Sequence, residues 1–338
     1  MKAVALKRYL PISDPESFLD VELPDPKPEG KDLLVRVHAV SVNPVDTKVR
    51  SPKDKTEASP RVLGWDAAGV VEATGPDVTR FKKGDAVFYA GSILRPGCDS
   101  ELHLVDERIV GPKPRSLDFA QAAALPLTAL TAYEGLFDRC AIDPGGRHAG
   151  RTLLVINGAG GVGSIAIQLA KLAGLRVIAT ASRPESQQWC RELGADHVIN
   201  HREDIPRQLE DAGSPEVDYI FNTVDTAGYW TVMGDVIKPF GRIVSIVETS
   251  QPLDLGRMMG KSASFSWELM FTRSRFQTPD MDEQHRALKQ VAEWLDAGRL
   301  RTTLTEKLSP ISAANLRAAH GKLESGKMVG KLVLEGWR

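Results

Sequence analysis

The sequence predicts an α/β protein with two domains, one antiparallel and β-rich, the other built on a doubly wound parallel sheet. Two observations carry this prediction. Up to about residue 127 the chain reads as short strands broken by proline and glycine, whereas from residue 152 apolar strands alternate with amphipathic helices. Such alternation is typical of a parallel sheet covered by helices on both faces. The length of 338 residues is ample for two hydrophobic cores.

The N-terminal part contains β-rich segments separated by turn-forming residues. Residues 33–42 (LLVRVHAVSV) and 67–75 (AAGVVEATG) are rich in β-branched side chains, and 78–88 leads from a turn into a strand. Residues 24–32 contain three prolines and indicate a loop, because proline donates no backbone hydrogen bond. We therefore expect an antiparallel β-rich domain in this part of the chain.

The middle and C-terminal parts change to helices and buried strands. Residues 118–137 are rich in Ala and Leu and predict a helix, which Pro126 divides because proline interrupts the helical hydrogen bonds. The pattern that follows predicts strands at 152–158, 176–181, 197–200, 217–224, 241–247 and 330–336, and helices at 162–174, 184–194, 282–300 and 312–326.

Composition and charge limit the possible partners. Lys and Arg total 43 against 44 Asp and Glu, so no global field favours nucleic acid or an anionic membrane. No apolar stretch approaches the ~18 residues that span a bilayer, and the start MKAVALKRYL lacks a signal-peptide core. The three cysteines form no CxxC pair, which favours a reduced, cytoplasmic setting. We expect a small-molecule partner, with no nucleic acid and no membrane.

The strongest motif is the glycine-rich stretch INGAGGVGS. Gly158, Gly160 and Gly163 form G-x-G-x-x-G, with Gly161 and Val162 inside it, between a buried strand and a helix. The first glycine permits a tight turn, the second lets a pyrophosphate approach the backbone, and the third lets helix and strand pack closely. The helix N-terminus would bind the phosphates. The motif predicts a Rossmann dinucleotide site; the alternative is a glycine-rich turn without a ligand.

The end of the second strand predicts the cofactor. An acid about 20 residues beyond the glycines would bind the ribose 2′-hydroxyl of NAD. Here Ser182 and Arg183 occupy that place, and the first acid is Glu185. A hydroxyl and a guanidinium suit a 2′-phosphate, so we predict NADP(H). The alternative is that Arg183 is an ordinary solvated surface residue.

Seven segments of the chain follow one another in an order typical of a known family: 41–50, 63–78, 81–88, 122–136, 156–164, 193–204 and 326–334. Together these segments resemble the medium-chain dehydrogenase/reductase superfamily, closest to its quinone oxidoreductase branch, which includes "zinc-type alcohol dehydrogenase-like" proteins. The resemblance implies a discontinuous GroES-like β-barrel catalytic domain at 1–128 and 275–338, a Rossmann domain at 129–274, and a homodimer.

The resemblance also shows which zinc ligands are missing. The first ligand would be a cysteine within 38–46, the second a histidine at Trp65 and the third a cysteine at Leu127. A catalytic zinc needs about three N, S or O ligands, so we expect no zinc. His38 and His103 are possible substitutes, but their spacing fits no ligand pattern, which favours structural roles.

Without a metal, other groups must stabilise the negative charge that follows hydride transfer. This charge is easier to stabilise when it is spread over an enone or a quinone. We therefore predict an NADPH-dependent oxidoreductase that reduces a quinone or an α,β-unsaturated carbonyl compound. Two alternatives stay open: an NADP-dependent alcohol or ketone dehydrogenase, and an NADPH-binding module with little catalysis.

Three residues of SVNPVDTKVR are candidates for catalysis by resemblance. Asn43 matches an asparagine near the nicotinamide and could donate to the substrate oxygen. Asp46 matches the acid of the motif, but pairing with Arg50 is an equal alternative. Lys48 stands where several relatives carry tyrosine; it could polarise the carbonyl or protonate the enolate, or be a solvated lysine.

Further contacts are expected from resemblance and from strand ends. His201 matches a residue beside the adenosine. Asn222, Thr223 and Ile246 end the fourth and fifth strands of the parallel sheet, where ligands of such sheets bind, and we expect Asn222 and Thr223 to face the ribose or nicotinamide side. By resemblance, Thr131 and Tyr133 lie where the chain passes beneath the nicotinamide, so they line a substrate pocket or simply pack. We expect the indole of Trp65 to fill the space of the missing metal and to help shape an apolar pocket.

Overall fold

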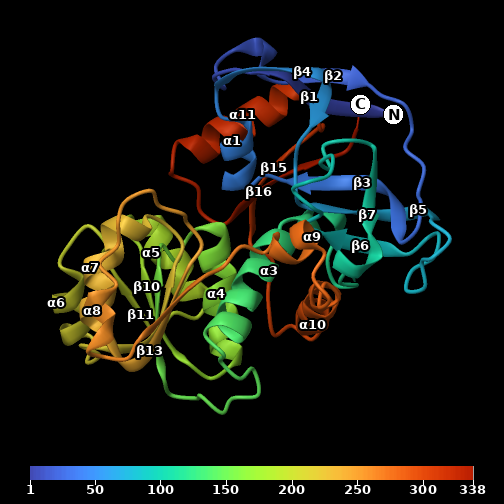
Figure 1. The fold of residues 1–338 in the computed structure, drawn as a ribbon. Helices are drawn as coiled ribbons and strands as arrows, with labels where there is room; N and C mark the ends of the chain where they lie inside the picture. The colour runs from blue at the N-terminus through green and yellow to red at the C-terminus, as the bar shows by residue number, and fades with distance from the viewer. Residues whose placement is uncertain (338) are drawn as a thin grey trace. The chain divides into compact units, whose positions relative to one another are not determined.

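The computed structural model describes residues 1–337. The chain divides into two compact units. The first contains Met1–Leu127 together with the chain from Phe271 onward, and the second contains Thr128–Met270. In Figure 1 the first unit is blue, teal and red-orange, and the second is green to orange. No helix among residues 1–337 is long and apolar enough to cross a membrane.

The first unit is built on two sheets. A small antiparallel sheet has the order β2-β1-β4, and a larger one has the order β15-β16-β3-β5-β6-β8, with β7 paired to β3. The C-terminal strand β16 lies antiparallel to β3, which explains why both ends of the chain belong to one unit. The strands are β1 (Lys2–Tyr9), β2 (Leu19–Glu22), β3 (Asp32–Ser41), β4 (Lys53–Val62), β5 (Ala67–Thr74), β6 (Ala86–Tyr89), β7 (Leu102–Asp106), β8 (Val110–Pro112), β15 (Leu304–Leu308) and β16 (Lys331–Glu335).

Helices connect and flank the strands of this unit. The N-terminal half supplies α1 (Pro44–Arg50), α2 (Phe119–Ala123) and two 3-10 turns, η1 (Pro15–Ser17) and η2 (Glu107–Ile109). The C-terminal segment supplies α9 (Thr272–Phe276), α10 (Glu283–Asp296) and α11 (Ala313–Glu324). The sequence did not predict α1, because it is short and begins with proline; proline is accommodated at the first helical position, where no N–H is required.

The second unit has a parallel sheet with the order β11-β10-β9-β12-β13-β14. Because β9 pairs with β10 on one side and β12 on the other, the strand order reverses here, at the point where such sheets bind ligands. The strands are β9 (Thr152–Ile156), β10 (Arg176–Thr180), β11 (His197–Ile199), β12 (Val217–Asn222), β13 (Ile237–Ser245) and β14 (Ser264–Trp267). The helices are α4 (Gly161–Leu172), α5 (Pro184–Glu192), α6 (Ile205–Asp211), α7 (Thr226–Val236) and α8 (Gly256–Met259).

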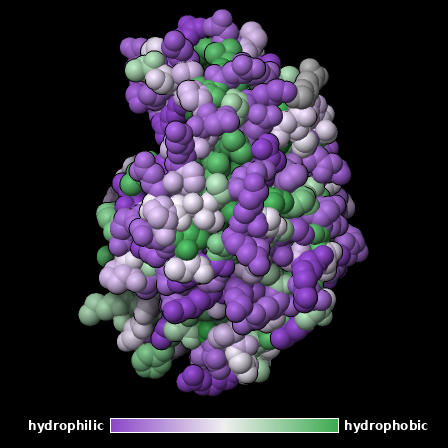
Figure 2. Space-filling view, turned by 90° about the vertical axis from the view of Figure 1, so that its right-hand side faces the viewer, coloured by the Kyte–Doolittle hydropathy of each residue, from purple (hydrophilic) through white to green (hydrophobic). Residues whose placement is uncertain are grey.

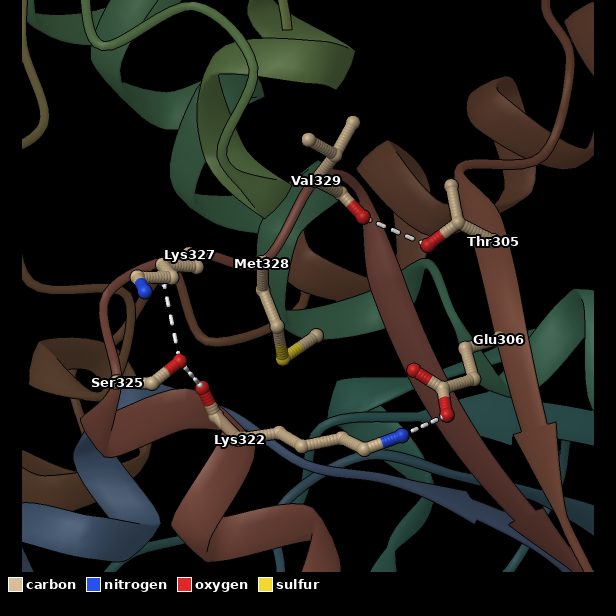
Figure 3. A pocket seen from close by; sticks show the side chains of 7 residues that line it. All are labelled: Thr305, Glu306, Lys322, Ser325, Lys327, Met328 and Val329. Carbon is tan, nitrogen blue, oxygen red and sulfur yellow. Dashed lines mark hydrogen bonds and ion pairs between the residues drawn. The ribbon is translucent and has the colours of Figure 1, made fainter. Parts of the chain in front are cut away.

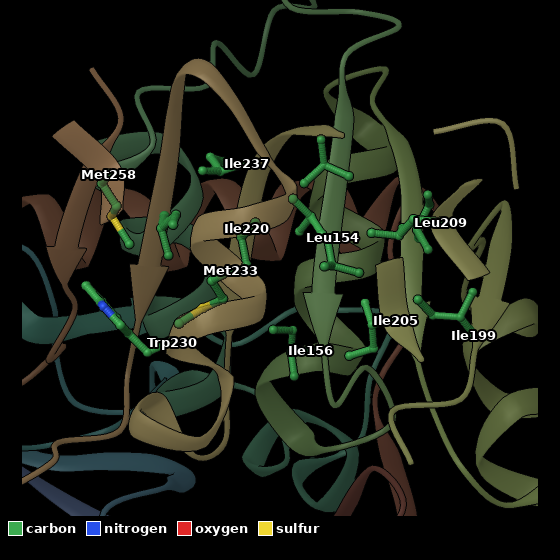
Figure 4. Packing of buried hydrophobic residues seen from close by; sticks show 14 residues of the cluster. Leu154, Ile156, Ile199, Ile205, Leu209, Ile220, Trp230, Met233, Ile237 and Met258 are labelled. Atoms are coloured by element: carbon green, nitrogen blue, oxygen red, sulfur yellow. The ribbon is translucent and has the colours of Figure 1, made fainter. Parts of the chain in front are cut away.

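Alternation along the strands creates a core on each face of this sheet. Leu154 and Ile156 of β9 share one face with Ile220 of β12, and they pack against α7 through Trp230 and Met233 (Figure 4). The period of two in a strand explains this arrangement. The predicted doubly wound parallel sheet is confirmed.

The break predicted at Pro126 is also observed. Helix α2 ends at Ala123, and a new helix, α3 (Pro126–Tyr133), begins on the proline and continues as a π-helical turn, η3 (Glu134–Arg139). On the face of the molecule shown in Figure 2, hydrophilic residues predominate and hydrophobic ones are scattered among them, as expected for a surface in contact with water.

Candidate functional site

The glycine-rich turn of the second unit joins β9 to α4. Asn157 opens the turn with a φ of 64°, a left-handed conformation that asparagine tolerates. Its N–H donates to Thr180 Oγ1 at 2.9 Å, and Thr223 Oγ1 donates to the Ile156 carbonyl at 2.9 Å. The ends of β9, β10 and β12 are therefore tied together at one edge of the sheet.

Two glycines of this turn are required by close packing. A Cβ on Gly163 would lie 2.5 Å from the Asn157 carbonyl oxygen, and one on Gly158 would lie 2.8 Å from the Ala179 Cβ. Real Cβ atoms do not approach backbone oxygen so closely, so the third glycine permits α4 to pack on the turn, as predicted.

The N-terminus of α4 has the features of an anion site. The helix has 12 residues, and its N-cap, Gly160, has no side chain to cap the first turn. The N–H groups of Gly161, Val162 and Gly163 begin the helix, where backbone donors have no intrahelical partner and the helix dipole is positive. Such donors fit the pyrophosphate of a dinucleotide.

His201 lies beside this turn. Its Nδ1 is 3.2 Å from Thr180 Oγ1, the hydroxyl that also accepts from Asn157. Burial lowers the pKa of His201, with a smaller effect of Arg202, so the imidazole is neutral at pH 7. A neutral, half-buried ring next to the glycine turn suits a contact with an adenosine, and that role stays a prediction.

Ser182 and Arg183 follow β10, and both side chains are partly exposed. Arg183 forms an ion pair with Glu185, with 2.9 Å between Nε and Oε1, and begins α5. Glu185 is 63% exposed, so water competes for this pair, and the guanidinium can exchange it for a stronger anion.

Asn222 requires a correction. Its side chain was expected to face the ribose, but the residue is wholly buried. Nδ2 donates to Ser245 Oγ at 3.0 Å, and Oδ1 accepts from the Val224 N–H at 3.3 Å. Asn222 thus joins the ends of β12 and β13, and the neighbouring Thr223 and Ile246 remain as candidates for ligand contacts.

Thr131 and Tyr133 lie on the last turns of α3. Thr131 is buried, at 5% exposure, and Tyr133 is half-buried with its ring edge-to-face against Phe137 at 4.8 Å. Tyr133 therefore packs within the second unit, Thr131 is buried, and the place of both in a substrate pocket stays a prediction.

In the first unit, a buried polar cluster is centred on the Asp66 carboxylate. Oδ1 accepts from the Leu127 N–H at 2.8 Å. Oδ2 accepts from Asn43 Nδ2 at 2.9 Å and from Lys331 Nζ at 3.0 Å. Burial raises the pKa of Asp66, and these donors oppose the rise, chiefly Lys331. The cluster joins the N-cap of α1, the turn before β5, the start of α3 at Leu127 and β16.

The same contacts correct the role expected for Asn43. Its amide was expected to donate to a substrate oxygen. The residue is 1% exposed, and its two amide hydrogens have acceptors in Asp66 Oδ2 and the Ser41 carbonyl, at 2.9 and 3.4 Å. Asn43 therefore organises the site from within, and a substrate would have to displace one of these acceptors to reach it.

Asp46 is the next member of the cluster. Its Oδ2 accepts from the Asn43 N–H at 2.7 Å, while Oδ1 is buried without a hydrogen-bond partner among the described residues. The alternative pairing with Arg50 is wrong, because Arg50 instead donates to the Leu10 carbonyl at 2.7 Å and pairs with Glu324. Burial raises the pKa of Asp46 to about 7.

This pKa predicts a pH effect on stability. Between about pH 4 and 7, folded Asp46 keeps a proton that the unfolded chain has released, so ionisation reduces the stability of the wild type as pH rises. Asp46→Asn removes this loss, because an amide does not titrate. We expect the variant to gain stability over the wild type from pH 4.5 to 8, by up to ~4 kcal/mol. Urea unfolding at pH 4.5 and pH 8 measures the free energy of unfolding of both proteins, and Asp54→Asn, at an exposed residue, is the control. An equal change in this free energy with pH for Asp46→Asn and wild type would contradict the prediction.

Trp65 and Lys48 complete the candidates of the first unit. Trp65 is 1% exposed, donates from Nε1 to the Ser92 carbonyl at 3.1 Å, and contacts Phe271 edge-to-face at 6.2 Å. Its contribution to a pocket stays a prediction. Lys48 lies on α1, two positions beyond Asp46, and is exposed. Its ammonium is therefore accessible to a substrate, unlike the amide of Asn43.

These residues do not form a zinc donor set. The positions expected for the second and third ligands carry the Trp65 indole, which already donates, and the aliphatic side chain of Leu127, and no cysteine occurs within 38–46. His103 contacts Tyr89 Oη and the Pro96 carbonyl, each at 3.0 Å, and His38 stacks on Phe119. Within residues 1–337 no three His, Cys, Asp or Glu side chains are arranged to hold a metal ion.

A separate hollow of about 450 Å³ lies between β15 and the end of α11 (Figure 3). Its polar side chains are used internally: Thr305 Oγ1 donates to the Val329 carbonyl at 2.6 Å, and Lys322 pairs with Glu306. Ser325 Oγ donates to the Lys322 carbonyl at 2.6 Å. With these groups satisfied, the hollow has no feature of a catalytic site.

Sequence reasoning missed Lys331 and Asp66. Lys331 lies 288 positions from Asn43 and 265 from Asp66, so no spacing in the sequence indicates their contact. Two segments of the resemblance contain these residues, 63–78 for Asp66 and 326–334 for Lys331, but neither segment indicates that the two side chains meet.

Comparison with known families gives two matches. Residues 29–115 match the alcohol dehydrogenase GroES-like domain, and residues 193–334 match the zinc-binding dehydrogenase family. The chain is 45% identical to a zinc-type alcohol dehydrogenase-like protein of Staphylococcus aureus, over 99% of both chains. It is 30% identical to human quinone oxidoreductase over 97% of both, and 31% identical to tomato 2-methylene-furan-3-one reductase over 99% of this chain and 79% of that one.

Solved structures agree with these matches. A crystal structure described as a zinc-dependent alcohol dehydrogenase from Rhizobium etli is 51% identical, with a TM-score of 0.94 over 100% of this chain and 98% of that one. Escherichia coli quinone oxidoreductase in complex with NADPH is 26% identical, with a TM-score of 0.82 over 99% of this chain and 100% of that one. The predicted combination of a GroES-like domain and a Rossmann-like parallel sheet is confirmed.

Proposed function

Because the chain belongs to the medium-chain dehydrogenase/reductase superfamily, in its quinone oxidoreductase and alcohol dehydrogenase-like branch, we propose that it uses NADPH to reduce a quinone or an α,β-unsaturated carbonyl compound without a metal. The relatives named above are oxidoreductases, and the E. coli quinone oxidoreductase was solved in complex with NADPH, which supports a nicotinamide cofactor here. The finer choice of cofactor and acceptor is the proposal.

One observation carries this proposal: the positions of the second and third zinc ligands carry the indole of Trp65 and the isobutyl group of Leu127, and no cysteine occurs within 38–46. These residues supply no set of ligands that could hold a Lewis-acidic metal at a carbonyl oxygen. The negative charge of the reduced acceptor must then be spread over the acceptor itself, as in an enolate or hydroquinone anion. The names of the human and tomato relatives, a quinone oxidoreductase and a reductase of a methylene-furanone, support this acceptor class.

In this mechanism the bound nicotinamide supplies the hydride, and the chain supplies position and a proton. The N–H groups at the N-terminus of α4 would hold the pyrophosphate, and His201 and Thr223, at the same edge of the sheet, would border the cofactor. Lys48 donates the proton from its ammonium to the enolate or phenolate oxygen, or to the adjacent carbon, and is reprotonated from water. Exposure of Lys48 on α1 supports this role.

The test is a screen of acceptors. In one assay, purified enzyme and NADPH are mixed with quinones, 2-alkenals and cyclic enones. In the reverse direction, the enzyme is mixed with NADP⁺ and secondary alcohols. We expect NADPH oxidation with the conjugated acceptors and little oxidation of alcohols. Turnover of alcohols alone, or one stoichiometric zinc by elemental analysis of unchelated protein, would favour the alcohol dehydrogenase alternative. Tight NADPH binding with no turnover would favour a binding module.

The preference for NADPH rests on Arg183. We expect Arg183→Ala to raise the Kd for NADPH about 10–100-fold, because one or two charge-assisted hydrogen bonds to the 2′-phosphate are lost, and to leave the Kd for NADH nearly unchanged. Isothermal titration with both cofactors measures this. Arg191→Ala, on the exposed part of the same helix α5, is the matched control. Equal affinities of the wild type for NADH and NADPH would contradict the assignment.

We further propose a homodimer that pairs through strand β14. This strand lies at the edge of the parallel sheet, where its outer backbone groups can pair with a second copy. Trp267 at its end and Leu269 just beyond are each 47% exposed, so both offer apolar surface that a second copy could cover. Sedimentation of the wild type and of Trp267→Lys tests the proposal: a dimer that becomes a monomer supports it, and a wild-type monomer contradicts it.

A further inference from the structure

The ammonium group of Lys331 is buried inside the first unit, with its side chain 4% exposed. It donates to the Val42 carbonyl at 2.8 Å, Asn43 Oδ1 at 2.5 Å and Asp66 Oδ2 at 3.0 Å. An ammonium has three hydrogens, and each has an acceptor here. Lys331 therefore has no hydrogen left for a substrate, and its charge is directed wholly into the protein.

We propose that Lys331 is the positioning residue of this site: its buried ammonium is the internal cation that fixes Asn43 and Asp66 and thereby sets the place of α1. The inference deepens the proposed function, on which it rests for the role of α1, because α1 carries Lys48. It assigns a function to a residue in the last strand, far in sequence from the other site residues.

The contacts around Asn43 show how the position is transmitted. Lys331 and Asp66 hold the two ends of the Asn43 amide, so the side chain has a single orientation. The Asn43 N–H donates to Asp46 Oδ2, which fixes the first turn of α1. Lys48 lies two residues farther along the same seven-residue helix. A shift of Asn43 would therefore move Lys48, which no other contact in this cluster holds.

Stability alone does not account for the pair. Removing a lysine and a carboxylate from water is costly, and well-packed apolar residues are often as stable in such places. The carboxylate of Asp66 also accepts from the Leu127 N–H, so the Lys331–Asp66 ion pair joins three separate segments of the chain. A bound metal ion could join segments in the same way and would keep a coordination position open for a substrate. A lysine that donates all of its hydrogens joins the segments without offering such a position.

The experiment compares Lys331→Met with the double variant Lys331→Met/Asp66→Asn. Lys331→Met alone leaves a buried carboxylate without its cation and should lower the unfolding temperature or prevent folding. In the double variant no charge is left uncompensated, so folding is restored, but the donor to Asn43 Oδ1 is still missing. Lys307→Met is the matched control. It removes an exposed ion pair between Lys307 on the neighbouring strand β15 and Glu335 on β16.

The first readout is hydrogen–deuterium exchange of residues 41–50, which does not depend on activity. We expect amides of this segment to exchange at least about tenfold faster in the double variant than in wild type or Lys307→Met, with other strands unchanged. Unchanged exchange in the double variant would overturn the proposal, because Lys331 would then only balance Asp66.

The second readout is kinetic. With a conjugated acceptor, the double variant should lose at least about tenfold in kcat, while the KM for NADPH stays within about twofold, because the cofactor edge of the second unit is untouched. Restoration of both unfolding temperature and kcat would overturn the positioning role. If no acceptor is reduced even by wild type, the proposed function fails, and the exchange measurement still decides the role of Lys331.

Discussion

Lys48→Met should reduce turnover of a quinone or enone about 10²–10⁴-fold, the usual contribution of a positioned proton donor. The side chain keeps its length and loses its ammonium, so the reduced acceptor must take its proton from water. Because Lys48 is exposed on α1 and lies outside the buried cluster, the variant should fold normally and bind NADPH as wild type does. Stopped-flow measurement of NADPH oxidation, with titration of NADPH binding, separates the two effects.

Two further variants sharpen this result. Lys48→Arg keeps the positive charge, but the pKa of a guanidinium is too high for efficient proton transfer. If Lys48→Arg recovers the turnover lost in Lys48→Met, Lys48 polarises the acceptor. If turnover stays low, Lys48 donates the proton. Lys53→Met, an exposed lysine on the following strand β4, should leave turnover unchanged. Full activity of Lys48→Met would remove this residue from the mechanism.

Gly163→Ala should disrupt the cofactor site by a different route. The new Cβ would lie 2.5 Å from the Asn157 carbonyl oxygen and 2.8 Å from Gly158 Cα, and these are backbone atoms that cannot rotate away. Helix α4 must move off the turn, at a cost of ~1–3 kcal/mol in stability. Because the same movement displaces the N–H groups of the first turn, we expect NADPH affinity to fall at least about tenfold.

Thermal unfolding and NADPH titration measure both effects. Gly321→Ala is the control, since this glycine lies within α11 and its Cβ would meet no atom within 4 Å. Alanine there should be neutral or stabilise by about 0.5–1 kcal/mol, because glycine is unfavourable inside a helix. Wild-type affinity in Gly163→Ala would show that the turn does not bind the dinucleotide.

The parallel sheet could be predicted because its signals are local. The apolar strand at 152–156, the glycines after it and the helix that follows are contiguous in sequence, and each step has a physical reason that acts over a few residues. Helix α1 could not be predicted in this way. It is too short for a helical period to show, and it is stabilised by its cap and by distant groups.

The candidate site of the first unit could not be predicted in full either, because its contacts join residues that are distant in the sequence. The sequence offered Asn43, Asp46 and Lys48 as three candidates for catalysis, but burial separates them: Asn43 and Asp46 are 1% exposed, and Lys48 is exposed. Asn222 was misplaced likewise, since a strand end indicates the edge of the sheet but not the direction of each side chain. Which hydrogens are already donated depends on neighbours that the sequence does not place.

The sequence by itself determined the Rossmann turn and the replacement of zinc-ligand residues at Trp65 and Leu127, because residue identity decides which atoms can bind a metal. Only the tertiary structure showed that a buried lysine and carboxylate lie together in this part of the first unit. Lys331 reaches Asp66 across 265 positions, since strand β16 returns to pair with β3. Long-range strand pairing brings a cation into the interior, and its charge must be matched there because water is absent.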